Sequence, residues 1–303
     1  MIYTPFGVIV TRGFNFSKKL DLLIKRCYYN TVSYSTTVTQ ENKRKMKKLI
    51  VAIVSAAMLL CFTGCDGRDP VLVDTVSYDV SPDIRSIDID IKAGDLCFKR
   101  GEVFAVESNL AHLAVNDDND RLAIRSPAVS TPFGSGSYQD AVLTVYVPSG
   151  AVLDRIDIST GAGRLSIDEL AAKSIEFDLG AGEVSIGSLV ATGSADIDGG
   201  AGRITISGGA LNDLDVDMGV GDLNITSRLS GDCQFNMGVG SASITLFGSM
   251  DDYRLDVSKG IGAVTVDGKA VTDFGSSGNG SCEIEINGGV GSIDLFFEET
   301  EEE

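Results

Sequence analysis

Hydrophobic and polar residues alternate along most of the chain between Ile84 and Phe297, and Gly-x-Gly pairs interrupt the alternation at regular intervals. Strict alternation over a short segment is typical of a β-strand that buries one face. From residue 156 to residue 297, a unit of strand, Gly-x-Gly and strand occurs seven times. The first glycines of the seven pairs are Gly161, Gly180, Gly200, Gly219, Gly238, Gly260 and Gly289.

The spacing of these units predicts a solenoid. Successive first glycines lie 19 to 22 residues apart, except for a last step of 29 residues. Such a unit is too short for a strand, a helix and their loops, whereas short repeats of fixed length stack on their neighbours. The sequence therefore predicts an all-β fold, a single-stranded parallel β-helix (solenoid) with coils of about 19–20 residues. We expect the coil to be right-handed.

Alignment of the units on their first glycine gives columns of constant character. The positions three and five residues before the glycine, and four and six residues after it, are apolar in every unit, so we expect them to face the core. The residue between the glycines forms a fifth apolar column, which we also expect inside the shared core. Its members are Ala162, Ala181, Ala201, Val220, Val239, Ile261 and Val290. The glycines themselves are predicted at a corner where neighbouring coils leave no room for a Cβ atom.

Three further columns are polar and are expected to face solvent. The column two residues before the glycine can bond backbone N–H groups at the following turn, and its members are Ser159, Asp178, Asp198, Asp217, Asn236, Ser258 and Asn287. The column five residues after the glycine consists of Ser166, Ser185, Thr205, Asn224, Ser243, Thr265 and Asp294. The column four residues before the glycine is acidic in six units, at Asp157, Glu176, Asp196, Asp215, Asp256 and Glu285, and is Gln234 in the seventh. Carboxylates stacked about 4.8 Å apart repel by roughly 0.9 kcal/mol per pair in water, which favours a solvated acidic face. A ladder that binds divalent cations is the alternative, because carboxylate oxygens suit Ca²⁺. No other cofactor is predicted.

Irregular segments flank the repeats. Residues 84–98 form a degenerate copy, with a turn at Lys92-Ala93-Gly94. We predict a tether over 65–83 and a solenoid domain over 84–297, irregular over 84–140 and regular over 141–297. Within it, a loop at 268–281 is expected to leave the stack, and Phe296-Phe297 to close the final coil. An acidic tail follows at 298–303.

The segment that precedes the tether predicts export. Residues 46–65, MKKLIVAIVSAAMLLCFTGC, begin with two lysines, continue with an apolar run and end in small residues. Phe62-Thr63-Gly64-Cys65 resembles the lipobox of bacterial lipoproteins, and this resemblance implies a lipoprotein signal peptide at 46–64 and acylation of Cys65. An ordinary cleaved signal with a chance cysteine is the alternative. Because export signals start at the N-terminus, we expect translation to begin at Met46 and residues 1–45 to be a mis-annotated extension.

The charge excludes some partners. Ten of the 25 basic residues and two of the 43 acidic residues lie in 1–64, so residues 65–303 carry 15 basic and 41 acidic side chains. A surface with this charge of −26 repels nucleic acid and anionic lipid headgroups. We therefore expect no nucleic-acid partner and only a lipid-anchor contact with the membrane.

Residues that could carry catalysis are scarce. His112 is the single histidine, no Gly-x-Ser-x-Gly elbow occurs, and no Cys-x-x-Cys pair is present. We expect no enzyme activity and no metal site of the zinc type. A polysaccharide-active enzyme that uses two carboxylates remains an alternative. Beyond Cys65 the chain has Cys97, Cys233 and Cys282, and the inward position of Cys233 predicts a buried free thiol.

The stretch from Ile84 to Phe297 resembles a bacterial family of adhesin-like proteins built from β-strand repeats, and is similar to the GIN domains of autotransporter-adhesin heads. The residues that carry the resemblance are Leu143 to Pro148, Ile156 to Gly163 and the repeats that follow. The resemblance implies a tethered β-helical domain of the cell envelope. We therefore expect an anchored surface protein for adhesion or for binding an envelope protein or glycan. An accessory protein of an envelope-stress system is the alternative.

Overall fold

The computed structural model describes residues 72–118, 120–126, 138, 140–271 and 278–298. The chain divides into two units, Met1–Cys65 and Asp66–Glu303, and every described residue belongs to the second. The predicted extension at 1–45, the signal at 46–64, Cys65 and residues 299–303 lie outside the described residues. Within the described part, no helix is long and apolar enough to cross a membrane.

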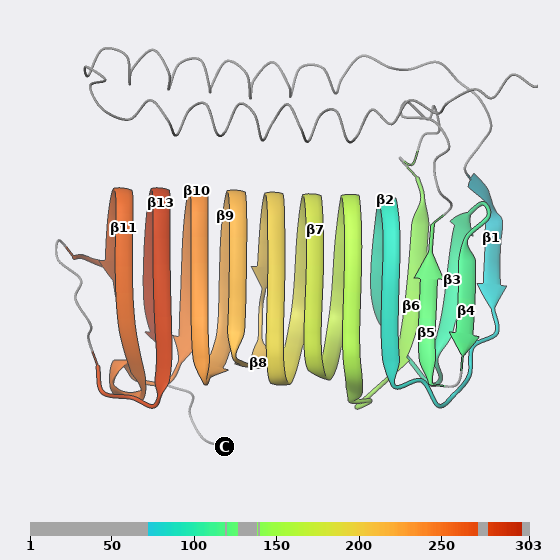
Figure 1. Ribbon diagram of the computed structural model, residues 1–303, viewed down its shortest axis with the longest axis horizontal. Helices are drawn as coiled ribbons and strands as arrows, with labels where there is room; N and C mark the ends of the chain where they lie inside the picture. Colours follow the sequence, from blue (N-terminus) through green and yellow to red (C-terminus); the bar gives the residue numbers. More distant parts are fainter. Residues whose placement is uncertain (1–71, 119, 127–137, 139, 272–277, 299–303) are drawn as a thin grey trace, which may run out of the picture. The chain divides into compact units, whose positions relative to one another are not determined.

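The described residues form one 13-stranded sheet that winds into a row of coils (Figure 1). They contain no α-helix and a single 3₁₀ turn, η1. The elements are β1 (Leu72–Tyr78), β2 (Ser86–Gly101), β3 (Ala105–Leu110), β4 (Ala114–Asp118), β5 (Arg121–Arg125), β6 (Val142–Pro148), β7 (Leu153–Ile206), β8 (Gly209–Asn212), β9 (Leu214–Ser230), β10 (Asp232–Phe247), η1 (Met250–Asp252), β11 (Tyr253–Val266), β12 (Lys269–Ala270) and β13 (Cys282–Glu298). The 54 residues of β7 are continuous strand because they pass through several coils without losing their ladder hydrogen bonds.

Neighbouring coils pair in parallel and in register, which confirms the solenoid. Gly202 of β7 lies opposite Gly221 of β9, and Gly221 lies opposite Gly240 of β10. A Cβ built on Gly221 would stand 1.8 Å from the carbonyl oxygen of Gly202, far inside van der Waals contact. The second glycine of each pair is therefore required by the stacking of the coils, as the sequence predicted.

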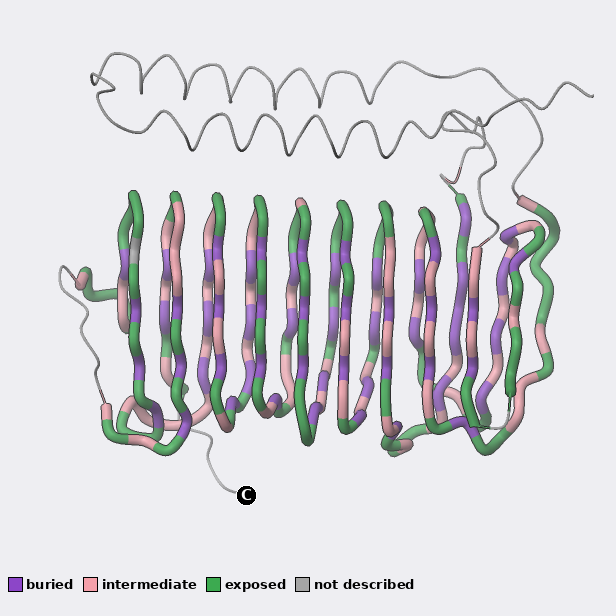
Figure 2. Tube along the Cα trace, in the orientation of Figure 1, coloured by how far each residue is buried: buried purple, intermediate pink, exposed green. Residues whose placement is uncertain are grey.

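The core lies inside the flattened coils. The four columns that were predicted to face inward are buried almost throughout, from Ile156 and Ile158 in the first regular coil to Ile284 and Leu295 in β13. Buried and exposed residues alternate along each strand at the same heights in successive coils (Figure 2). One continuous hydrophobic cluster therefore runs the length of the stack.

At the N-terminal end of the stack, the order of the strands in space differs from their order in the chain. β2 pairs with β7 so that Gly94 lies opposite Gly163, which confirms the degenerate copy. β5 and β6 pair with the two halves of β2 on its other side and together make one more coil. β4 and β3 then add antiparallel to β5 and β6, and β1 adds to β3. The prediction of a tether over 65–83 is therefore wrong for Leu72–Tyr78, because these residues extend the sheet.

The C-terminal end also departs from chain order. β13 pairs in parallel with both β10 and β11, so the last strand of the chain lies between two strands that precede it. β11 is thus the outermost coil, and β12 adds two antiparallel residues to it. The prediction that Phe296-Phe297 closes the final coil is wrong. Phe297 instead lies one coil further in and places its ring 6.0 Å from that of Tyr253.

Candidate functional site

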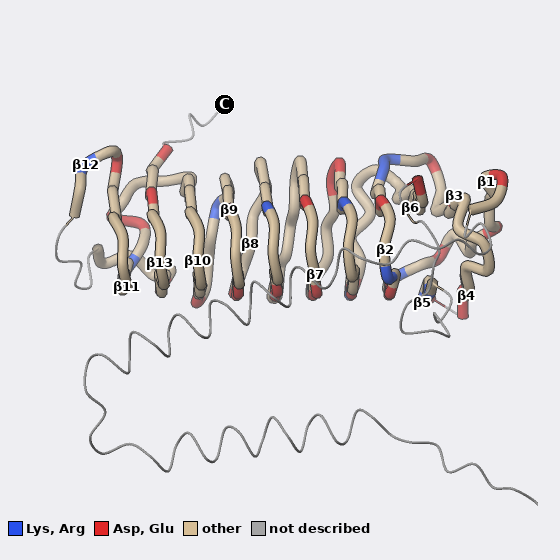
Figure 3. The backbone as a smooth tube through the Cα atoms, turned by 90° about the horizontal axis from the view of Figure 1, so that it is seen from above, with Lys and Arg blue, Asp and Glu red and all other residues tan. Residues whose placement is uncertain are grey.

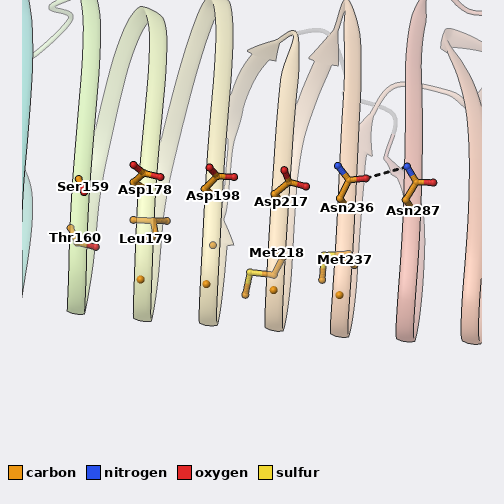
Figure 4. A pocket seen from close by; sticks show the side chains of 15 residues that line it. Ser159, Thr160, Asp178, Leu179, Asp198, Asp217, Met218, Asn236, Met237 and Asn287 are labelled. Carbon is orange, nitrogen blue, oxygen red and sulfur yellow. Dashed lines mark hydrogen bonds between the residues drawn. The ribbon is translucent and has the colours of Figure 1, made fainter. Parts of the chain in front are cut away.

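An open trough follows the glycine corner across six coils, with a volume of about 730 Å³. It exists because of the sequence pattern. The residue two positions before each first glycine points outward, and the glycine, the next outward position, has no side chain. Because the polar residue and the glycine recur in every stacked coil, the glycines leave a continuous channel beside a row of polar side chains (Figure 4). The lining residues are Ser159, Thr160, Asp178, Leu179, Gly180, Asp198, Gly199, Gly200, Asp217, Met218, Gly219, Asn236, Met237, Gly238 and Asn287.

The polar wall of the trough has carboxylates at its centre. Asp178, Asp198 and Asp217 stand side by side on successive coils, with Ser159 at one end and two asparagines at the other (Figure 4). Asp198 lies opposite Asp217, which lies opposite Asn236. The Nδ2 atom of Asn287 donates to Oδ1 of Asn236 at 3.1 Å. The two asparagines thus form a hydrogen bond with each other, whereas the neighbouring carboxylates carry like charges and repel one another.

Beneath the wall lies an apolar column that the sequence alignment did not identify. Leu179, Met218 and Met237 occupy the position just before the first glycine and are buried. In the intervening coil this position is Gly199, where a Cβ would stand 2.7 Å from the Sδ atom of Met218. The inward alternation therefore extends one step closer to the corner than predicted, and the flexible methionines fill the space that varies between coils.

The acids at the centre of the stack raise one another's pKa. Burial and the charges of neighbouring carboxylates raise the pKa of Asp196, Asp198 and Asp215 above the ordinary value. For Asp198 the charged neighbours are Asp217, Asp178 and Glu176. Figure 3 shows acidic residues recurring along one edge of the row of coils. A positive charge placed against this part of the surface would be attracted to it and would stabilise the ionised carboxylates.

The N-terminal coils differ because arginines accompany their acids. Asp88 pairs with Arg121 and Arg125, and the hydrogen bond from Arg125 is the main reason why the pKa of Asp88 is lowered. Arg155 pairs with both Asp157 and Glu176. The excess of negative charge in the trough therefore lies over the coils that carry Asp196 to Asp217.

The predicted cation ladder is present as a column but runs in a different spatial order. Glu285 lies opposite both Gln234 and Asp256, so the order is Asp157, Glu176, Asp196, Asp215, Gln234, Glu285, Asp256. Among the described residues, no group of three or more His, Cys, Asp or Glu side chains is arranged to hold a metal ion. Binding of Ca²⁺ by this column stays a prediction.

The fifth apolar column does not belong to the core. The residue between the two glycines points away from the coil, because the chain reverses direction there between two glycines. Val220 is 48% exposed and Ile261 is 73% exposed. This column forms an apolar ridge along the corner, made of Ala162, Ala181, Ala201, Val220, Val239, Val290 and Ile261 in spatial order. Its apolar character is therefore a surface property.

His112 lies away from the trough. It is exposed in the turn between β3 and β4 and adopts a left-handed backbone conformation, with φ of 58°. It is not among the residues that line the trough. The acids of the trough follow the repeat and have no histidine partner there, so the geometry suits binding of charge better than proton transfer.

Residues 81–301 match the model of the family described as Toastrack DUF4097. The chain belongs to the Toastrack DUF4097 family. The match begins just before β2 and extends past β13, so it spans the whole stack of coils that builds the trough. The search of curated proteins found no match to this Toastrack chain.

Solved structures similar to this Toastrack chain cover most of its length at low identity. A candidate cell adhesion protein from Clostridium sporogenes is 15% identical, with 74% of this chain and 99% of that chain covered and a TM-score of 0.33. A candidate adhesin from Bacteroides fragilis is 13% identical, with coverage of 73% and 95% and a TM-score of 0.29. A candidate lipid binding protein from Parabacteroides distasonis is 14% identical, with coverage of 73% and 96% and a TM-score of 0.34.

Proposed function

We propose that this Toastrack protein is a non-enzymatic, lipid-anchored protein of the bacterial cell envelope that binds a basic segment of another envelope protein along its acidic trough. Its solenoid acts as a rigid surface held outside the membrane. The observation that carries the proposal is the row of Asp178, Asp198 and Asp217 along an open trough of about 730 Å³. A row of carboxylates in a groove is complementary to lysine and arginine side chains presented at intervals along an extended chain.

The electrostatics of the trough favour a cationic partner over a neutral one. Burial and the repulsion of neighbouring carboxylates raise the pKa of Asp198 in the trough and of Asp196 and Asp215 in the adjoining acidic column. A bound ammonium or guanidinium group removes part of this repulsion, so binding relieves an unfavourable interaction that the free protein carries. The residues that line the trough include no aromatic ring on which a sugar could stack, which makes a glycan the weaker candidate.

The anchor is supported by the sequence of residues 46–65. Acylation of Cys65 by several chains would hold the protein stably at the membrane, because each buried CH₂ contributes about 0.8 kcal/mol. The acidic solenoid is then repelled by anionic headgroups. This combination would keep the trough accessible on the extracytoplasmic side of the membrane.

Binding of a fluorescent oligolysine peptide to the full chain tests the trough. The variant Asp178→Asn/Asp198→Asn/Asp217→Asn should bind the peptide about 3- to 150-fold more weakly, since three exposed ion pairs contribute roughly 0.2–1 kcal/mol each. The matched control is Asp168→Asn/Glu183→Gln/Asp251→Asn, which removes the same charge from exposed positions outside the trough. The control should keep most of the affinity.

Two results would overturn the assignment to the trough. Equal losses in both variants would mean that the peptide responds only to net charge. Binding of neutral glycans with no binding of oligolysine at low salt would replace the basic partner by a sugar. Raising the salt concentration should weaken the interaction with oligolysine, because the ion pairs are exposed and screened.

The anchor is tested separately with Cys65→Ser. In a bacterial host fed an alkyne-labelled fatty acid, the chain with Cys65 should carry the label and sediment with membranes. The Cys65→Ser chain should lose both properties while its melting temperature stays the same. Label that persists on the serine variant would disprove acylation at Cys65, and this result would leave the test of the trough unaffected.

A further inference from the structure

Two buried cysteines lie at the C-terminal end of the stack, and the proposed function makes no use of them. Cys233 is the second residue of β10 and is 3% exposed, and Cys282 is the first residue of β13 and is 5% exposed. Both belong to the continuous hydrophobic core. They come from neighbouring coils, because β10 and β13 pair in parallel along their whole length.

The register places the two cysteines on a short diagonal. The backbone N–H of Glu283 donates to the carbonyl of Gly231 at 3.0 Å, so Cys282 lies beside Gly231 and Cys233 lies two residues further along the same ladder. Both side chains point inward, since residues two apart on a strand share a face.

Each of the two thiols is the largest influence on the pKa of the other. Hydrogen bonding to Cys282 is the main influence on the Cys233 thiol and lowers its pKa, and the same bond raises the pKa of Cys282. These opposite directions fit a bond in which Cys282 donates to the sulfur of Cys233. The Cys233 thiol also contacts the carbonyl oxygen of Ser230 at 3.5 Å.

We propose that Cys233 and Cys282 form a disulfide that fastens β13 in its place between β10 and β11. A disulfide needs Cα atoms about 4.4–6.8 Å apart. The register sets Cys233 and Cys282 one coil and two residues apart, so the Cα atom of Cys282 has to move towards Cys233. Cys282 directly follows the bend at Ser281, and the ladder to β10 is held from Glu283 onwards, so this movement keeps that ladder and loosens only the pairing of Cys282 with Tyr253. The bond would close a loop that contains all of β11.

The chemistry requires a disulfide oxidant such as oxidised glutathione. The Cys233 thiolate attacks one sulfur of the oxidant, which releases one glutathione thiolate and leaves a mixed disulfide on Cys233. The Cys282 thiol then loses its proton and attacks the Cys233 sulfur, which releases the second glutathione. Two protein thiols are oxidised to one disulfide, and one glutathione disulfide is reduced to two thiols.

Refolding of the full chain tests the proposal. The denatured chain is refolded in a mixture of oxidised and reduced glutathione, alkylated, and digested with trypsin without reduction. We expect mass spectrometry to find residues 229–254, which contain Cys233, joined to residues 270–303, which contain Cys282. The oxidised protein should melt about 5–10 °C higher than the reduced protein, because closing a loop of this length constrains the unfolded chain.

Single variants separate this bond from other pairings. Cys97→Ser should retain the joined peptides and the shift in melting temperature, whereas Cys233→Ser and Cys282→Ser should lose both. Recovery of both peptides separately alkylated from oxidised, folded Cys97→Ser would overturn the proposal. A bond between Cys97 and either partner in the unmodified chain would overturn it as well. If a serine variant fails to fold, the peptide map of Cys97→Ser alone decides the question.

Discussion

Gly291 lies directly over Gly240, although β11 and its flanking loops separate the two glycines in the chain. A Cβ atom built on Gly291 would stand 1.6 Å from the carbonyl oxygen of Gly240. The same close approach relates Gly262 to Gly291. The three glycines therefore share one corner, and their contacts follow the order of the last three coils, which is β10, β13, β11.

Replacing Gly291 should be severely destabilising. Gly291→Ala combines a clash with backbone and a backbone conformation of φ +151° that suits glycine. We expect the free energy of unfolding to fall by about 3–5 kcal/mol. Denaturant unfolding followed by circular dichroism measures this loss.

Two further glycines separate the causes. Gly219→Ala meets the carbonyl oxygen of Gly200 at 2.5 Å without a positive φ, so it measures the clash. Gly150→Ala has φ of +76° and nothing within 4 Å of the added atom, so it measures backbone strain and should cost about 1–2 kcal/mol. A Gly291→Ala variant no less stable than Gly150→Ala would show that the corner tolerates a Cβ and would contradict the stacking.

Engineered cysteines can verify the order of the coils. Ser243 lies opposite Asp294, and Asp294 lies opposite Thr265, so Ser243 and Thr265 are two coils apart. Neighbouring coils are about 4.8 Å apart and coils two steps apart are about 9.6 Å apart. S243C/D294C should therefore form a disulfide under mild oxidation, and S243C/T265C should not.

The opposite pattern of disulfides would indicate a different order of coils. A disulfide in S243C/T265C alone would mean that β11 stacks directly on β10, as chain order suggests. Both engineered pairs are made in the Cys233→Ser/Cys282→Ser background, because trypsin leaves Ser243 in one peptide with Cys233 and Asp294 in one peptide with Cys282.

Removing one acid from the trough should stabilise the protein at neutral pH. The pKa of Asp198 is raised by burial and by Asp217 and Asp178, so the folded state holds its proton to higher pH than the unfolded state does. The resulting penalty is absent below the ordinary pKa of 3.8 and grows as pH rises through the raised value. Asp198→Asn should gain a few tenths to about 1 kcal/mol at pH 7, given roughly 0.9 kcal/mol per neighbouring pair in water.

The gain of Asp198→Asn should disappear in acid and shrink at high salt, which melting curves across pH and salt concentration can follow. Asp168→Asn, which removes an exposed acid outside the trough, is the control and should change stability little. A loss of stability in Asp198→Asn at neutral pH would show that its carboxylate makes favourable contacts and would refute the repulsion.

Asp88 should behave in the opposite way. Hydrogen bonds from Arg125 and Arg121 lower its pKa, so its stabilisation is present above the ordinary value of 3.8 and is lost as pH falls through the lowered value. Asp88→Asn should cost about 1–3 kcal/mol at pH 7, since the bonds it replaces join charged groups. Chemical unfolding at pH 7 and in acid should show a large difference that closes in acid. A constant difference at both pH values would mean that packing is the cause.

The repeat could be predicted because two constraints agree in every unit. Period-two alternation fixes which residues face inward, and the glycine spacing fixes the length of the coil. Both depend on local sequence, so Ile158, Phe177 and Ile197 could be placed correctly in the core. The acidic columns followed from the same alignment.

The parts that failed depend on contacts between distant segments. Every coil carries the same glycine pair, so the sequence around Gly260 and Gly289 is compatible with either order of stacking. Only the structure shows that β13 lies between β10 and β11. The exposed ridge at Val220 was grouped with the core because apolar character alone does not give direction at a corner.

The trough was missed for another reason. Its wall was recognised as a column of Ser, Asp and Asn, but these residues were explained by turns rather than by a shared groove. The apolar column under the wall was hidden because Thr160 and Gly199 interrupt the run of Leu179, Met218 and Met237. An alignment that allowed glycine as a core residue beside a methionine would have revealed it.

The interleaved end of the stack bears on how the protein folds while it is being synthesised. Coils from β7 to β10 can each dock on the one before as the chain emerges, and such growth is favourable because every step buries a neighbouring face. β11 emerges before β13 and must wait for it, since β13 supplies its parallel partner. The outermost coil of the stack, β11, is therefore synthesised before the coil that it packs on, β13. A nascent chain that stalls before residue 298 would leave β11 without its neighbour, whatever the state of the coils behind it.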